Sequence, residues 1–250
     1  MVLPAKSFLK LLMIKNLKIL MAYVSVFLLM LSNSSCSNSN FDIIIVGGGT
    51  SGIASAIQSS RLGSKTLLIE ESNWLGGMMT SAGVSAMDGN YKMPSGFLKE
   101  FRDSLVSHYG HLDSLKTGWV SNLMFEPSIG NRILKDIAGS EKNLTILYGT
   151  TIDKVVKDKK FTLKTKENSV TYKSKILIDA TELGDLIPKL NLPYFIGMDS
   201  SKRFKEDIAP EFSNDIVQDL TYVMILKDFG KPMTINQPKN YNKNEFICSY

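Results

Sequence analysis

The sequence of 250 residues predicts an α/β fold with a parallel sheet and an antiparallel β-meander. Three observations support this prediction. An aliphatic strand at residues 43–46 leads into a glycine-rich turn, a helix and a second strand that ends in an acid. Two amphipathic helices follow. Three short strands separated by lysine-rich or polar turns then occupy residues 151–172.

The chain begins with a segment predicted to direct export. Lysines precede an apolar run at residues 19–31, which suits a signal peptide and is short for a membrane span of about 20 residues. Cys36 follows small residues as in a bacterial lipoprotein cleavage site, although Asn33 stands where an aliphatic residue is usual. We predict a signal at 1–36, a lipid anchor at Cys36, a polar tether at 37–40 and a membrane-anchored place in the bacterial cell envelope. A periplasmic or secreted protein is the alternative.

The charge argues against a nucleic-acid-binding protein, and the cysteine count argues against a protein built on a disulfide framework. The formal net charge is +5, but without residues 1–36 it is +1, so the body is nearly neutral and nucleic acid is not an expected partner. If Cys36 is lipidated, Cys248 is unpaired, because the sequence has two cysteines. A disulfide framework is therefore not expected, even in an exported protein.

Residues 42–52 hold a strand and a glycine turn. Ile43–Val46 is a continuous β-branched run, as in a parallel strand buried on both faces. The next six residues fit G-x-G-x-x-G: Gly47 allows a tight turn, Gly49 lets a pyrophosphate approach the backbone, and Gly52 lets the helix pack closely. The candidate phosphate-binding residues are therefore Gly47, Gly49, Thr50, Ser51 and Gly52.

The helix and strand that follow complete a dinucleotide signal. A helix at 53–62 would turn free N–H groups and its positive dipole end toward phosphates. A second strand at 65–69 ends at Glu70, which can accept hydrogen bonds from both hydroxyls of a ribose. Together these elements predict a dinucleotide site. The alternative is a glycine-rich turn in an unrelated α/β protein.

The stretch 71–93 is predicted to be a loop. Gly76 and Gly77 are followed by small residues, which indicates backbone lying close to a ligand; a flexible loop is the alternative. Helices are expected from a Ser95 cap to residue 109 and from Pro127 to 138. The sequence has two histidines, and no carboxylate–histidine cluster accompanies them, so no metal site is predicted.

Short strands dominate the next part of the chain. They are expected at 144–148, 151–156, 161–165, 170–172, 175–178 and 220–226. The lysines of the meander alternate with apolar residues, which favours a solvated sheet face over a binding patch. The strand at 175–178 leads into Asp179-Ala-Thr-Glu-Leu-Gly-Asp-Leu186.

This order of motifs resembles the two-dinucleotide-binding-domain flavoproteins of glutathione-reductase type. Within them it is similar to the bacterial FAD-dependent oxidoreductase family whose members are often labelled "xanthan lyase". The resemblance lies in residues 42–54, Glu70, 75–84 and 178–186, and it covers roughly 41–227. The "lyase" label has no support in the residues, since no group of side chains suits proton abstraction from a uronic acid.

The resemblance implies a Rossmann-like FAD/NAD(P)-binding domain at 41–195, an incomplete substrate-side domain at 196–250, and non-covalent FAD. The glycine turn would serve the pyrophosphate and Glu70 the adenosine ribose. The helix at Asp185 would add a second positive end. The other implied cofactor residues are Gly76, Gly77 and Thr80 near the pyrophosphate or flavin, Thr151 and Ile152 with backbone toward adenine, and Ala180 and Thr181 along the cofactor.

The implied activity is hydride transfer between flavin N5 and a small organic or carbohydrate-derived substrate. Family members are longer, so we expect a truncated enzyme or, alternatively, a non-enzymatic remnant of a broken flavoprotein gene. An NAD-binding dehydrogenase is a weaker alternative. Simple NAD domains alternate strand and helix, whereas this chain has a Gly-Gly loop and a meander. No catalytic acid or base is identified: Arg132, Glu126 and Asp185 each suit a helix surface or cap.

Overall fold

The computed structural model describes residues 21, 40–118, 121–167, 170–219, 223, 229–234, 236–242 and 244. The chain divides into residues 1–40 and 41–250. The predicted signal, except Met21, and Cys36 lie outside the described residues, as does the predicted strand at 220–226 except Val223. Within the part that the structure describes, no helix is long and apolar enough to cross a membrane.

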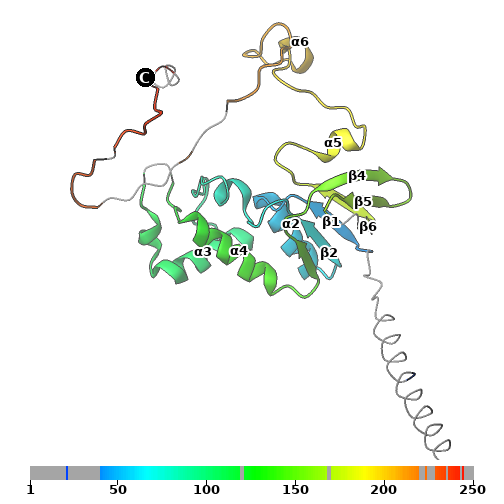
Figure 1. The fold of residues 1–250 in the computed structure, drawn as a ribbon, viewed down its shortest axis with the longest axis horizontal. Helices are drawn as coiled ribbons and strands as arrows, with labels where there is room; N and C mark the ends of the chain where they lie inside the picture. The colour runs from blue at the N-terminus through cyan, green and yellow to red at the C-terminus, as the bar shows by residue number, and fades with distance from the viewer. Residues whose placement is uncertain are drawn as a thin grey trace, which may run out of the picture. The chain divides into compact units, whose positions relative to one another are not determined.

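A four-stranded parallel sheet forms the centre of the fold (Figure 1). Its order is β3-β2-β1-β7, and Ile43 pairs with Thr66 on one side and with Ile176 on the other. The aliphatic runs of the two central strands are almost fully buried, as expected for strands covered on both faces. The strands are β1 (Ile43–Val46), β2 (Thr66–Ile69), β3 (Leu144–Leu147) and β7 (Ile176–Asp179).

Helices cover one face of this sheet. Ile45 and Leu68 point into a core that also contains Phe101 and Leu134 from the helices. Because side chains alternate along a strand, only every second residue of β1 and β2 reaches this core. The helices are α2 (Thr50–Arg61), α3 (Gly96–Tyr109) and α4 (Pro127–Gly139), with the short 3-10 turns η1 (Gly77–Met79) and η2 (Leu112–Leu115) between them.

The antiparallel meander covers the other face (Figure 1). Ile44 and Val46 of the sheet pack with Leu163 and Tyr172 of the meander in a second core. Its strands pair in the order β4-β5-β6 and are β4 (Ile152–Lys157), β5 (Phe161–Thr165) and β6 (Thr171–Ser174). Two short helices follow β7: α5 (Leu186–Lys189) and α6 (Ser201–Phe204).

The predicted strands and helices between residues 43 and 179 are confirmed, with small shifts at their ends. The largest shift is in α2, which begins at Thr50 because Gly49 already has the extended backbone of a cap residue. Ser95 also has extended backbone, but its side chain makes no capping hydrogen bond, so the predicted cap at Ser95 is wrong in that respect. The predicted loop at 71–93 contains the η1 turn.

Candidate dinucleotide-binding site

A cavity of about 770 Å³ lies at the carboxyl ends of β1, β2 and β7. This is the edge at which open parallel sheets bind ligands, and the volume is in the usual range for cofactor sites. Segments far apart in the sequence meet here: the glycine turn after β1, the end of β2, the η1 turn, the start of β4, and the loop after β7.

Two of the three motif glycines are required by packing. Gly47 has φ +96°, and a Cβ on it would lie 2.3 Å from the Ala180 carbonyl oxygen. A Cβ on Gly52 would lie 1.9 Å from the Gly47 carbonyl oxygen. The glycines therefore allow β1, β7 and α2 to approach one another at backbone distance, and this places the first turn of α2 at the cavity.

Gly49 is different, because nothing in the described part of the protein requires a glycine there. Its φ is −62°, which any residue adopts, and no described atom lies within 4 Å of where its Cβ would be. It lines the cavity at the N-terminus of α2, which has neither a side-chain cap nor an acidic residue in its first turn. Open backbone at a positive helix end fits a diphosphate, which is the group that this cavity wall can bind.

Glu70 is fixed at the end of β2. Its side chain is buried, with the residue only 8% exposed. Its Oε2 accepts a 2.6 Å hydrogen bond from the Gly48 N–H, and its Oε1 accepts one of 2.8 Å from the Ser72 N–H. Each carboxylate oxygen can accept a further bond, so a ribose diol remains a suitable partner. Burial, and then the charge of Glu70, raises the pKa of the neighbouring Tyr148.

The η1 turn brings a second glycine pair to the first. The Gly76 N–H donates to the Gly48 carbonyl (2.8 Å), and the Thr50 hydroxyl donates to the Gly76 carbonyl (3.2 Å). Thr80 is buried, and its hydroxyl donates to the Leu75 carbonyl (2.6 Å). Gly76 and Thr80 thus hold the turn, while Gly77 lies on the cavity wall.

Asp179 organises the loop after β7. Its Oδ1 accepts from the Thr181 N–H (3.1 Å) and hydroxyl (2.7 Å), and its Oδ2 accepts from the Leu186 N–H (3.1 Å). The Thr181 hydroxyl in turn accepts from the Asp185 N–H (2.8 Å). The expected second positive end at Asp185 is therefore wrong: α5 has four residues, and protein groups already bind these two N–H groups.

Thr151 and Ile152 line the end of the cavity beside the meander. The Thr151 N–H donates to both Glu167 oxygens (3.0 Å each), its hydroxyl donates to Oε1 (2.7 Å), and its carbonyl accepts from the Lys166 N–H. The hydrogen bond from the Thr151 hydroxyl is the largest of the effects that lower the pKa of Glu167. Backbone contact of Thr151 and Ile152 with adenine stays a prediction, since Glu167 holds the Thr151 N–H here.

The predicted site residues fall into two groups. On the cavity wall lie Gly47, Gly49, Glu70, Gly77, Thr151, Ile152, Ala180 and Thr181. The other five do not line it: Thr50, Ser51 and Gly52 form the first turn of α2, and Gly76 and Thr80 hold the η1 turn. Sequence reasoning missed Asp179 and Glu167 as supports and Glu182 as a wall residue. The available signal for Asp179 was an acid at the carboxyl end of a strand beside the glycine turn.

Arg132, Glu126 and the two histidines do not line the cavity. Arg132 Nη2 lies 3.1 Å from His108 Nδ1, and His111 Nδ1 accepts from the Asp113 N–H. Glu126 is the N-cap residue of α4. Among the residues that the structure describes, no three His, Cys, Asp or Glu side chains gather as metal ligands do.

Comparison with known proteins identifies the family. The protein-family model described as "FAD dependent oxidoreductase" matches residues 42–247 of the sequence. The chain belongs to this family. The predicted resemblance is thereby confirmed at the level of FAD-dependent oxidoreductases, and family membership supports FAD as the cofactor.

Two curated relatives match part of the chain. Leghemoglobin reductase of Vigna unguiculata is 28% identical over 159 residues, which is 63% of this chain and 30% of the relative. Dihydrolipoyl dehydrogenase 1, mitochondrial, of Arabidopsis thaliana is 28% identical over 150 residues, which is 59% of this chain and 29% of the relative. The chain thus spans less than a third of the length of these relatives.

Two solved structures are similar to part of this chain. Thioredoxin reductase of T. acidophilum has a TM-score of 0.38 at 20% identity, covering 58% of this chain and 36% of that one. The p-nitrophenol 4-monooxygenase PnpA of Pseudomonas putida DLL-E4 has a TM-score of 0.44 at 11% identity, covering 64% and 46%.

Proposed function

We propose that this protein binds FAD non-covalently and acts as an oxidoreductase on a small organic or carbohydrate-derived substrate. The observation that supports this most directly is the open backbone at Gly49, at the uncapped N-terminus of α2. A glycine that the protein does not need for its own packing is explained by a ligand that approaches the backbone.

Each part of the cavity wall has a role in this proposal. The first turn of α2 binds the diphosphate through N–H groups and the positive helix end. Glu70, held by two backbone N–H groups, orients the adenosine ribose. Ala180 and Thr181 line the cavity, and in this proposal they contact the cofactor between the diphosphate and the flavin. When bound, FAD supplies hydride acceptance and donation at flavin N5.

A paired substitution tests the binding proposal. Gly49→Ala puts a methyl group into open space, so the free energy of unfolding should change by less than about 1 kcal/mol. The same methyl group obstructs the diphosphate, so FAD affinity should fall by at least about tenfold, measured by flavin fluorescence titration.

Gly139→Ala is the matched control. Gly139 lies at the end of α4, and its Cβ would also meet no described atom within 4 Å. It should leave both stability and FAD affinity close to those of the unmodified chain. If Gly49→Ala binds FAD as tightly as Gly139→Ala does, the assignment of Gly49 to the diphosphate is wrong.

We also propose that the protein is exported and anchored by a lipid on Cys36, supported by the apolar run at 19–31 and the small residues before the cysteine. Cys36→Ala should then move the protein from the membrane fraction to the soluble fraction. Recovery of the unmodified chain in the soluble fraction, with residue 36 unlipidated by mass spectrometry, would count against the anchor.

A further inference from the structure

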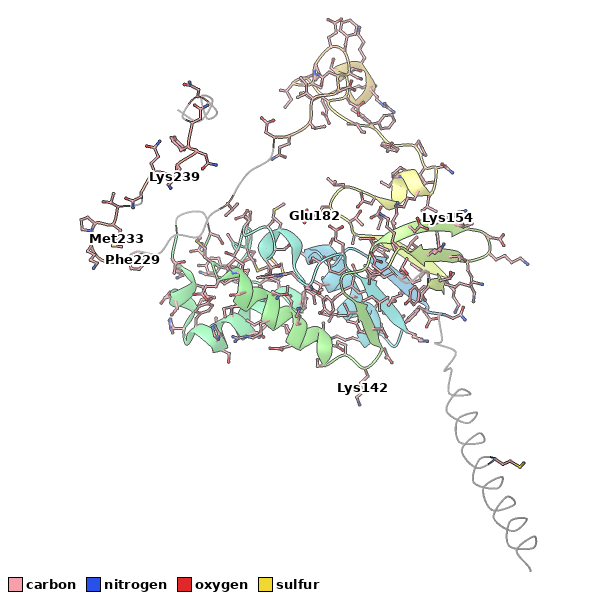
Figure 2. All side chains as sticks on the ribbon, in the orientation of Figure 1. Lys142, Lys154, Glu182, Phe229, Met233 and Lys239 are labelled. Carbon is pink, nitrogen blue, oxygen red and sulfur yellow. The ribbon has the colours of Figure 1, made fainter. Side chains whose placement is uncertain are left out.

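Glu182 lies against the part of the cavity wall that is assigned to the diphosphate. Its Oε1 is 3.0 Å from where a Cβ on Gly77 would be, and that same point is 3.0 Å from the Gly49 Cα. Glu182 is exposed and lines the cavity. Figure 2 shows its side chain in the loop between β7 and α5. A carboxylate oxygen therefore lies beside the contact between Gly77 and Gly49, next to the open backbone of Gly49.

No partner in the described part of the chain accounts for this position. No hydrogen bond or ion pair to Glu182 occurs among the described residues, although other acids of the same region have clear partners. The loop that carries Glu182 is nevertheless fixed, since Asp179 and Thr181 bind its backbone on both sides. The loop thus holds the backbone of Glu182 at the cavity wall, and no described donor binds the Glu182 carboxylate.

The uncapped start of α2 explains why a negative charge is tolerated there. The positive end of a helix attracts any nearby anion, and α2 has no acidic residue of its own in its first turn. Without a bound ligand, Glu182 can supply that charge. When a diphosphate binds, the two anions compete for the same positive end, and their repulsion opposes binding.

We propose that Glu182 is an affinity-determining residue: its carboxylate, called here the anionic cap although it makes no hydrogen bond to α2, lowers the affinity of the α2 N-terminus for the FAD diphosphate. This inference rests on the proposed binding of FAD at this cavity. It predicts that the unmodified protein spends part of its binding energy on moving the carboxylate aside. Of the charged residues on the cavity wall, Glu182 is distinguished by its closeness to Gly49 and Gly77; the others are Glu70, Glu71, Asp185, Lys166 and Lys189.

The test compares three full-length chains by flavin fluorescence titration with FAD. Glu182→Gln keeps the shape of the side chain and removes its charge. Asp158→Asn is the control, because it removes one negative charge from the exposed turn between β4 and β5, outside the cavity wall. Glu182→Gln should bind FAD about tenfold more tightly at low salt, while Asp158→Asn should match the unmodified chain.

Salt provides a second readout. Because mobile ions screen repulsion between partly exposed charges, the affinity ratio of Glu182→Gln to the unmodified chain should shrink as potassium chloride is raised. Glu182→Ala should bind more tightly than the unmodified chain, like Glu182→Gln. Far-ultraviolet circular dichroism checks that every variant keeps its fold.

Each outcome decides the inference. Equal or weaker FAD binding by folded Glu182→Gln overturns the cap and leaves the proposed function standing. Binding of FAD by Glu182→Gln when the unmodified chain shows none supports the cap. If no chain binds FAD, titration with ADP is the remaining test; failure of all chains to bind ADP overturns the cap and the proposed site together.

Discussion

Two neighbouring turns face the cavity, and they are built in opposite ways. The turn after β1 is shaped by missing side chains, since a Cβ on Gly47 or Gly52 would collide with backbone atoms. The loop after β7 is shaped by added side-chain groups, since the Asp179 carboxylate binds three donors and the Thr181 hydroxyl links two residues. The first turn leaves its backbone open at Gly49, and the second loop has its backbone bonded internally.

This difference separates two tasks in one site. The first turn presents a positive helix end with free space at Gly49, which suits an anionic ligand. In the second loop, Thr181 and Asp179 already bind the N–H groups of Asp185 and Leu186. This loop therefore acts as a wall that holds Ala180, Thr181 and Glu182 at the cavity. Substitutions in the two turns should therefore differ in how they change the free energy of unfolding and the affinity for FAD.

The largest effect should come from Gly52→Ala. The new Cβ would lie 1.9 Å from the Gly47 carbonyl oxygen, and backbone cannot move aside without separating α2 from β1. We expect a loss of about 3 kcal/mol or more in the free energy of unfolding, measured by urea denaturation. FAD binding should be lost as well, because the first turn of α2 shifts.

Gly139→Ala again serves as the control for adding a methyl group to a helix. The contrast with Gly49→Ala is informative too, since the three substitutions are chemically identical. A Gly52→Ala protein as stable as the Gly139→Ala protein would show that the close contact between helix and turn is not needed.

An intermediate effect is expected from Asp179→Asn. Asparagine has one acceptor oxygen where the carboxylate has two, so at least one of the bonds from Thr181 and Leu186 is lost. Because Asp179 is exposed, the expected cost is about 1 kcal/mol in the free energy of unfolding. FAD affinity should fall several-fold, since the loop would no longer be held.

Asp185→Asn is the matched control for stability. It removes a charge from the same loop, but the Asp185 side chain makes no capping hydrogen bond. Urea denaturation should therefore distinguish the two variants. Equal losses in both would mean that the charge of the loop, and not the bonds of Asp179, sets its stability.

The two turns also differ in how far the sequence revealed them. The glycine turn was predicted because residue type dictates its conformation, and a G-x-G-x-x-G run between a strand and a helix is typical of dinucleotide-binding turns. The roles of Asp179 and Glu167 were not predicted. Their partners are backbone N–H groups two to sixteen residues away, and an acid in a loop carries no mark of which N–H it will bind.

The parallel sheet and the meander were predicted for a similar reason. A run such as Ile43–Val46 indicates burial on both faces, and an exposed lysine between buried residues, as in β6, indicates one solvated face. The arrangement at Asp185 was predicted wrongly, because it depends on where the Thr181 hydroxyl and the Asp179 carboxylate point. Tertiary packing decides where a side chain points, and the spacing of residues in the sequence does not predict it.

The smallest expected effect concerns Glu167, where an exposed side chain repeats the design of the β7 loop. Hydrogen bonds from Thr151 lower the pKa of Glu167 in the folded chain. The interaction is therefore complete above the ordinary glutamate range and is lost as the pH falls through the lowered folded value. Nuclear magnetic resonance should show the Thr151 amide shifting on acidification only below the usual pKa of a glutamate, about 4.3.

In Glu167→Gln that titration should vanish, leaving the fold unchanged. If the Thr151 amide titrates at the ordinary value, the carboxylate does not hold this N–H in solution, and the Thr151 backbone is open to adenine as the β1 turn is open to phosphate.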